Sequence, residues 1–470
     1  MGKGLLLTVS LAAGGLALLL VLRRCARHEG ADDDAHREVA VEPLGAASDA
    51  AALAARCARG APSAALGEGL ARGDLLIGEA VATRDGYAIG LVRTVAGGGR
   101  RASVAILPAD LHHATFVDLA PQAGDVPPPR PFVERGELLA ATYAAADAGG
   151  ARSLAIVRID ASGKSAPFAQ VPQQQDESLA FDIVSSGDHT IVTWDEDALL
   201  TGGGAGGAAG GAAAKGNGAV EARGVIKVAP LPAKGGSVAT ATIVSASGAD
   251  VERPRGVARP GGGFWVGWIA RRADPHVDDD PNAIERQGED HAFSWLETAR
   301  VGDDGQRVGE VRRITSETGH VTAFDWLAGP DGKLEIFARD DAEVTREGEG
   351  GRILRIPLRD DGAPTFPLVK NSVGQGDPAP VGDPTNRWLF YADTSEHAHA
   401  LFLRDGDMPD TLEPALDGQT VLLAQSGARP AGATPTLDVL AVGPSEKGSE
   451  QAEARNFFCH EARATLRGVE

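Results

Sequence analysis

The sequence predicts an all-β fold assembled from repeated units of four short strands. Turn glycines recur along the chain, and a strongly apolar segment of strand length follows each of them. Glycine and proline are also abundant, at 61 and 28 of 470 residues. Many short strands joined by tight turns need both residue types, because glycine reaches positive φ and proline fixes φ. Hydrophobic residues make up 43% of the chain, which is enough to build a large core and excludes wholesale disorder.

The repeat becomes visible when the chain is aligned on its turn residues. The turn residues are Gly86, Gly136, Gly187, Gly263, Gly332 and Asn386, and their spacings are 50, 51, 76, 69 and 54 residues. The segments read RDG-YAIGLV, ERG-ELLAATY, SSG-DHTIVTW, GGG-FWVGW, PDG-KLEIF and PTN-RWLFY. Further strands follow each segment, such as SVAILPAD and then ATFVDLAP, and apolar segments such as LAFDIVSS and VTAFDWLAG precede the turns. Tight hairpins require Gly or Asn at such positions, so each unit of about fifty residues holds four strands.

This pattern resembles the β-propeller repeat proteins as a class, over about residues 75–445. The resemblance implies an all-β, six- or seven-bladed β-propeller, assigned to residues 76–465. Strands at 437–443 and 456–462 would give a partial seventh blade, completed by a strand from the N-terminal side. All six tryptophans fall on expected strands and should pack between blades. A β-sandwich or two tandem all-β domains would not explain the common register of the six turns.

A membrane anchor is expected in front of this domain, within residues 1–30. Residues 4–22 form an uncharged apolar run that is long enough to span a bilayer as one transmembrane helix. No small-residue cleavage site follows the run, so it is expected to stay attached as an uncleaved signal. Heavy use of Arg, Ala and Gly is typical of a GC-rich bacterial genome, which would make this the inner membrane. Residues 31–75 are expected to form an acidic, Ala-rich spacer with a short helix at 47–60.

Two features of the sequence give opposite indications of the side of the membrane on which the propeller lies. The arginines after the anchor favour the cytoplasm by the positive-inside rule. Cys57 and Cys459, however, flank the repeats, and the ends of a circular propeller meet in space. A disulfide between them would stabilise the ring by roughly 4–5 kcal/mol on chain-entropy grounds. Such a bond favours an oxidising compartment, so the periplasm is the expected location and the cytoplasm the alternative.

Two insertions lie at equivalent places in adjacent units, at residues 196–223 and 271–290. Both should leave the same face of the ring, and insertions gathered on one face often mark a binding face. The first is a Gly/Ala-rich linker. The second carries Asp278, Asp280, Asn282 and Glu289 at a spacing similar to a calcium-binding loop. Ala283 replaces the glycine that such a loop needs, so a solvated acidic loop is the alternative to calcium, and no other cofactor is expected.

Charged residues also gather where the second strand of each unit ends. These binding-face candidates are Arg93, Asp195, Arg271, Arg339, Asp340 and Asp393. Together they could bind a carboxylate or a sugar, since arginine matches planar anions. The alternative is that they form ion pairs between blades.

Function is constrained mainly by what is missing from the sequence. The net charge of −20 disfavours nucleic acid as a partner. Motifs for serine hydrolases, zinc proteases, P-loops and CxxC chemistry are all absent. The sequence therefore favours a non-enzymatic, membrane-anchored propeller that binds a protein or glycan. The alternatives are a polysaccharide hydrolase or lyase, whose acids would meet over the central channel from different blades, and a cytoplasm-facing scaffold.

Overall fold

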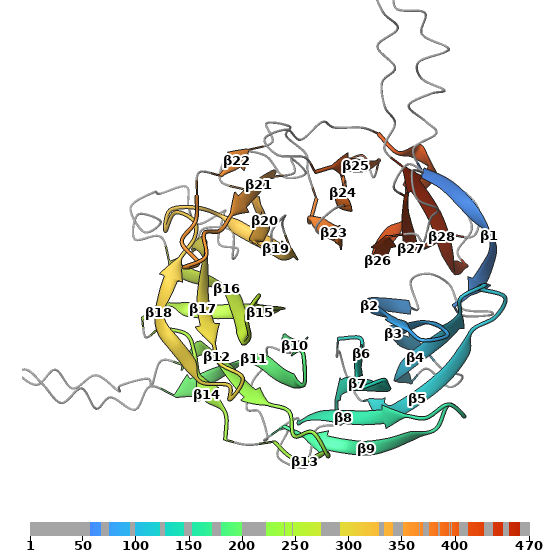
Figure 1. Ribbon diagram of the computed structural model, residues 1–470, viewed down its shortest axis with the longest axis horizontal. Helices are drawn as coiled ribbons and strands as arrows, with labels where there is room; N and C mark the ends of the chain where they lie inside the picture. The colour runs from blue at the N-terminus through green and yellow to red at the C-terminus, as the bar shows by residue number, and fades with distance from the viewer. Residues whose placement is uncertain are drawn as a thin grey trace, which may run out of the picture. The chain divides into compact units, whose positions relative to one another are not determined.

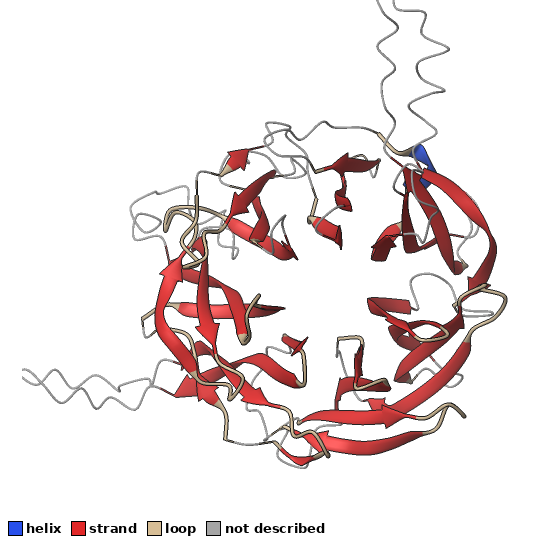
Figure 2. Ribbon diagram, viewed as in Figure 1, coloured by secondary structure: helices blue, strands red, loops and turns tan. Residues whose placement is uncertain are grey.

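Residues 57–460 are described by the computed structural model, with short gaps, and they belong to one compact unit, 52–470. The gaps are 67–74, 95–98, 123–126, 145–152, 172–179, 200–221, 239, 247, 274–291, 329–332, 342–350, 366, 370–375, 384–385, 394, 396, 404–411, 427–435 and 445–450. Figure 2 shows that the described residues form strands joined by loops and turns, with one short 3-10 helix, η6 (Pro414–Leu416). Among them there is no helix long and apolar enough to cross a membrane. The expected anchor at 4–22 lies outside the described residues.

Seven sheets stand around a common centre as the blades of a propeller (Figure 1). Blade 1 is β2 (Leu75–Thr83), β3 (Gly86–Thr94), β4 (Arg100–Pro108) and β5 (Thr115–Gln122). Blade 2 is β6 (Arg130–Glu134), β7 (Glu137–Tyr143), β8 (Leu154–Ile159) and β9 (Ser165–Gln170), with β13 (Gly236–Ser237) added in parallel at the edge. Blade 3 is β10 (Phe181–Ser186), β11 (His189–Leu199), β12 (Ala222–Pro230) and β14 (Thr242–Ile243). Blade 4 is β15 (Asp250–Ala258), β16 (Phe264–Ala273), β17 (Ala292–Val301) and β18 (Arg307–Arg313).

The remaining blades complete the ring and join its two ends. Blade 5 is β19 (Val321–Ala328), β20 (Leu334–Asp340), β21 (Arg352–Pro357) and β22 (Leu368–Val369). Blade 6 is β23 (Ala379–Asp383), β24 (Asn386–Ala392) and β25 (Ala398–Phe402). Blade 7 is β26 (Thr420–Ser426), β27 (Thr436–Pro444) and β28 (Ala452–His460), with β1 (Cys57–Ala65) as its outermost strand. The first described strand of the chain therefore pairs with the last and closes the ring.

The closure confirms the expected seventh blade and the expected disulfide. Cys57 faces Cys459 in the β1–β28 ladder and is bonded to it. One detail of the sequence analysis is wrong, because residues 57–60 are strand and not the end of a helix in a spacer. The antiparallel ladder with β28 supplies hydrogen bonds that outweigh the helix propensity of this Ala-rich segment.

The hairpin turns follow the expected positions where the structure describes them, with one difference; Gly332 and most of both expected insertions lie outside the described residues. Gly136, Gly187 and Gly263 have positive φ, whereas Asn386 begins β24 and is not among the positive-φ residues. The strands of blades 3 and 4 also extend into the expected insertions, since β11 reaches residue 199 and β16 reaches residue 273. The described core divides into seven apolar clusters, one at each blade interface, and all six tryptophans belong to these clusters. This confirms that the tryptophans pack between blades.

Candidate functional site

The central channel is a cavity of about 990 Å³ enclosed by the ring. The innermost strand of each of the seven blades contributes to its wall, namely β2, β6, β10, β15, β19, β23 and β26. These strands stand nearest the centre in Figure 1. A concave site of this size is typical of small-molecule and cofactor sites, so the channel is the candidate functional site.

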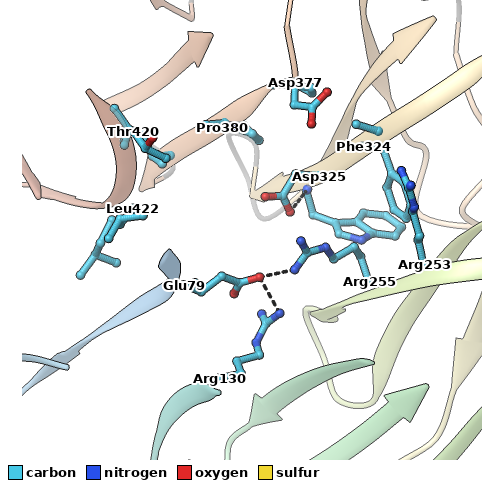
Figure 3. Close-up of a pocket in the computed structure, with 18 of the residues that line it drawn as sticks. Glu79, Arg130, Arg253, Arg255, Phe324, Asp325, Asp377, Pro380, Thr420 and Leu422 are labelled. Atoms are coloured by element: carbon cyan, nitrogen blue, oxygen red, sulfur yellow. Dashed lines mark hydrogen bonds and ion pairs between the residues drawn. The ribbon is translucent and has the colours of Figure 1, made fainter. Parts of the chain in front are cut away.

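A network of alternating charges lies at one half of the channel, with one charged residue from each of blades 1 to 5; four of the five line the channel, and the buried Asp182 contacts the wall residue Arg130. In order these residues are Glu79, Arg130, Asp182, Arg255 and Asp325. Arg130 joins its neighbours on both sides, at 2.8 Å to Glu79 and 2.7 Å to Asp182. Arg255 reaches across to the Glu79 carboxylate, as the dashed lines in Figure 3 show. Asp182 also accepts hydrogen bonds from the backbone N–H groups of Ile183 and Gly256.

β-Bulges in the inner strands direct side chains toward this space. A bulge places two residues opposite one on the partner strand, and it re-aims the side chains at that point. In four inner strands a bulged residue lines the channel, namely Glu79 in β2, Arg253 in β15, Thr322 in β19 and Leu422 in β26. Arg253 has a φ of 54° and is held there by a 3.0 Å hydrogen bond from its N–H to Asp195. The backbone strain is therefore located in the channel wall.

The carboxylates of the network titrate differently because their surroundings differ. Burial raises the pKa of Asp325 to about 6, against the opposing charge of Arg255. Burial also raises the pKa of Asp182, although Arg130 and Arg255 oppose it. Burial acts in the same direction on Glu79, but Arg130 and Arg255 together outweigh it and lower the pKa of that carboxyl. Glu79 is thus ionised at neutral pH, while Asp325 changes its charge near pH 6.

The other half of the channel wall is mainly apolar. Blades 6 and 7 contribute Pro380, Val421 and Leu422, and Thr420 adds a hydroxyl. On the side of the charged network, Trp326 of blade 5 adds an indole that packs against Gly267 of blade 4. Figure 3 shows Pro380, Thr420 and Leu422 across the channel from Arg255. A ligand in the channel would therefore meet a charged wall on one side and an apolar wall on the other.

None of the six binding-face candidates is among the channel-lining residues that the structure describes. Two of them contact wall residues: Asp195 accepts the Arg253 N–H, and Arg339 reaches Asp377 at 3.3 Å. The other four pair with residues outside the wall: Arg93 with Asp118 at 2.6 Å, Arg271 with Glu252 at 2.7 Å, Asp340 with Arg352 at 3.2 Å and Asp393 with His399 at 3.1 Å.

The calcium candidates Asp278, Asp280, Asn282 and Glu289 lie outside the described residues. Within the described part of the chain, no group of three or more acidic, His or Cys residues is arranged to hold a metal ion. The structure therefore does not test the calcium hypothesis.

The charged network of the channel was not among the predicted site residues, although the sequence carries a signal for it. The tripeptide Ala-Phe-Asp occurs at 180–182 and again at 323–325, each time within an otherwise apolar segment ahead of a turn. Both copies lie on innermost strands, where they place Asp182 and Asp325. A carboxylate that recurs inside an apolar strand is therefore the sequence signal that indicates this network.

Comparisons with known proteins find solved structures of distant likeness. No family model and no curated protein matches the chain. An α-L-arabinofuranosidase from Fusarium graminearum is similar at 8% identity, over 83% of this chain and 93% of that chain, with a TM-score of 0.41. An endo-arabinase from Bacteroides thetaiotaomicron is similar at 12% identity, over 71% and 95%, with a TM-score of 0.30. A puromycin-hydrolysing peptidase from Mycobacterium tuberculosis is similar at 13% identity, over 85% and 54%, with a TM-score of 0.43. Such a likeness concerns the fold alone.

Proposed function

We propose that the protein is a saccharide-binding β-propeller and that the central channel is its binding site. The observation that carries this is the charged network of Glu79, Arg130, Asp182, Arg255 and Asp325, facing an apolar wall in a 990 Å³ cavity. Carboxylates only accept hydrogen bonds and guanidinium groups only donate them, whereas each sugar hydroxyl does both. A rigid array of alternating acceptors and donors is thus complementary to neighbouring hydroxyls. The apolar wall is complementary to the C–H face of a sugar ring.

The shape of the site favours a saccharide over a protein partner. Protein interfaces bury broad surfaces of some 800 Å² on each side, with charged residues depleted at their centres. The charged network instead lies inside the ring. Its central members are still accessible to solvent from the channel, since the side chain of Glu79 is 42% exposed and that of Arg255 is 38% exposed. A ligand that enters the channel can therefore reach them.

The proposed location is the periplasm, with residues 4–22 as a membrane anchor. The Cys57–Cys459 disulfide supports an oxidising compartment. The anchor rests on its length and apolar character alone.

Binding is tested by titrating the purified protein with a panel of oligosaccharides by calorimetry. We expect at least one saccharide class to bind, and Arg255→Gln to weaken that binding about tenfold or more, because it removes a charged donor from the channel. Arg101→Gln is the matched control, since Arg101 pairs with Asp118 on the exposed side of blade 1 and is not in the channel wall. Equal binding by Arg255→Gln and wild type would count against the channel as the site.

Hydrolysis of the bound saccharide is a second candidate function, and one observation favours it. Glu79 and Asp325 come from different blades, and their pKa values are moved in opposite directions, down for Glu79 and up for Asp325. Carboxyl pairs of this kind serve glycoside hydrolysis, in which the protonated acid gives its proton to the leaving oxygen while the ionised one assists on the other side. Incubation with the bound saccharide should then release new reducing ends, and Asp325→Asn should stop the release. No release from a saccharide that binds would leave binding as the function.

A further inference from the structure

Of the six charged side chains in the described channel wall, one has no ion-pair partner within 4 Å among the described residues. The six are Glu79, Arg130, Arg253, Arg255, Asp325 and Asp377. Glu79 pairs with both Arg130 and Arg255. Arg253 lies 3.5 Å from Glu252, and Asp377 lies 3.3 Å from Arg339. Asp325 accepts one hydrogen bond, from the Trp326 backbone N–H at 2.8 Å. Among the described wall residues, its negative charge is the one without a direct counter-ion.

The space beside Asp325 is suited to a cation that approaches from the side of blades 6 and 7. On the other side stands Arg255, which is already bound to Glu79. Figure 3 shows Asp377 and Pro380 facing Asp325 across this part of the channel. The Asp377 side chain is 72% exposed and adds a second carboxylate. A positively charged group there would meet the Asp325 carboxylate, with the apolar residues of blades 6 and 7 on its other side.

A polar donor in the same wall also has no partner. Trp326 follows Asp325 on β19 and is 7% exposed, and its indole Nε1 has no hydrogen-bond acceptor among the described residues. A buried donor without an acceptor costs about 1–3 kcal/mol, so this part of the wall carries an unmet hydrogen-bonding group next to Asp325.

We propose that the saccharide bound in the channel carries an ammonium group, as a hexosamine without its acetyl group does, and that Asp325 binds this group. The inference rests on the proposed function and narrows its ligand class to amino sugars. A neutral sugar would leave the charge of Asp325 uncompensated, whereas an ammonium group forms a charge-assisted hydrogen bond with it.

The test compares two ligands that differ only in this group. The full-length protein is titrated with oligomers of glucosamine and with oligomers of N-acetylglucosamine of the same length, near neutral pH. We expect the glucosamine oligomer to bind about tenfold more tightly or better. Asp325→Asn should remove this preference, because the amide carries no charge. Asp110→Asn, a surface change of the same kind, should keep it, since the Asp110 side chain is 61% exposed and lies outside the wall.

The outcomes separate this proposal from the proposed function. Equal affinity for the two oligomers would overturn the ammonium site and leave a saccharide-binding channel in place. A preference that persists in Asp325→Asn would also overturn it, provided that thermal unfolding shows the variant to be folded. No binding of any oligosaccharide would overturn both. Competition by calcium ions alone, abolished in Asp325→Asn, would assign the site to an inorganic cation instead.

The pH dependence gives an independent readout. Burial sets the pKa of Asp325 at about 6, Arg255 opposes this, and Glu79 and Asp182 add to it. Asp377 faces the same space from blade 6. Affinity for the glucosamine oligomer should therefore fall as the pH drops below about 6, where Asp325 takes up a proton. Asp325→Asn should show no such fall, and a parallel fall in this variant would point to another group.

Discussion

Asp325 places a carboxylate in the channel wall, and its negative charge lowers the stability of the folded chain. The pKa of this carboxyl is about 6 in the folded chain, well above the ordinary value of about 4 in an unfolded chain. The folded state therefore holds the proton more tightly than the unfolded state between these two values. Stability falls as the pH rises through this window, and the full penalty is present above pH ~6.

We therefore expect Asp325→Asn to raise the free energy of unfolding at about pH 7.5, by about 1–2 kcal/mol once screening by water in the channel is allowed for. The gain should shrink as the pH falls from ~6 towards ~4, because wild-type Asp325 is then protonated. Urea unfolding of both proteins at several pH values measures it. A variant less stable than wild type at about pH 7.5 would contradict this account of Asp325.

Glu335 shows the opposite case, a buried charge that holds two blades together. Its carboxylate binds Arg355 of its own blade through two nitrogens, at 2.8 and 3.1 Å. It also binds Arg387 of blade 6 at 2.9 Å. The two arginine side chains are only 2% and 4% exposed. Ionic groups buried to this degree depend on their partners.

Replacing Glu335 with Gln should lower the free energy of unfolding by roughly 3–5 kcal/mol, because two buried guanidinium groups lose their shared carboxylate. Glu137→Gln is the control, since Glu137 pairs with Arg158 at an exposed site. Denaturant unfolding compares the two variants. Similar small losses in both would mean that the buried triad contributes little.

The inner strand β19 depends on a glycine in the next blade. A Cβ atom at Gly267 would lie 2.8 Å from the ring of Trp326 and 3.1 Å from that of Phe324. These two rings also contact each other edge to face, with centroids 6.3 Å apart. The absence of a side chain at this point of β16 therefore lets β19 place Trp326 in the channel wall.

We expect Gly267→Val to displace Trp326, to weaken saccharide binding and to cost about 1–3 kcal/mol of stability through overpacking. Gly267→Ala should show the same changes to a smaller degree. Calorimetry and tryptophan fluorescence follow the two effects. Unaltered fluorescence and binding in the valine variant would show that the wall tolerates movement here.

At the scale of the whole molecule, the ring is closed by β1 in blade 7 and by the disulfide. The two cysteines are 402 residues apart in sequence, so the bond restricts nearly the entire described chain in its unfolded state. Ladder hydrogen bonds between β1 and β28 close the ring at the same place. The disulfide therefore reinforces a contact that the fold already makes.

Changing both Cys57 and Cys459 to Ser should lower the free energy of unfolding by roughly 2–5 kcal/mol, through the greater entropy of the unfolded chain. The ring itself should remain, as measured by circular dichroism. In wild type, alkylation of the unreduced, denatured protein should modify one of the three cysteines in the sequence, Cys25. Modification of all three would remove the support for an oxidising compartment.

Much of the architecture could be predicted from the sequence because it is local and repeated. Turn glycines such as Gly136 and Gly187 determine where hairpins form, and the apolar strands between them require burial on both faces. Repetition of this unit predicts a ring, and a ring brings its ends together. The Cys57–Cys459 bond and the completed seventh blade follow from that closure, as does the place of the tryptophans between blades.

The charged network of the channel could not be predicted in the same way, because it is not local. Glu79, Arg130, Asp182, Arg255 and Asp325 are spread over almost 250 residues, and each is an ordinary charged residue in its own strand. The predicted candidates lie near the ends of strands, and some of them support the wall from behind, as Asp195 supports Arg253. Bulges such as those at Glu79 and Arg253 change the register by one residue and determine which side chains face the channel.

The sequence by itself thus determined the repeat, the all-β class and the closure of the ring, because turn chemistry and strand periodicity act between neighbouring residues. Only the tertiary structure decided that seven blades surround the channel and that five of them join in a network of alternating charges, four of which line it. It also decided that Asp325 lacks an ion-pair partner within 4 Å among the described residues. These properties depend on distances between residues on different blades, and those distances arise only when all the blades pack together.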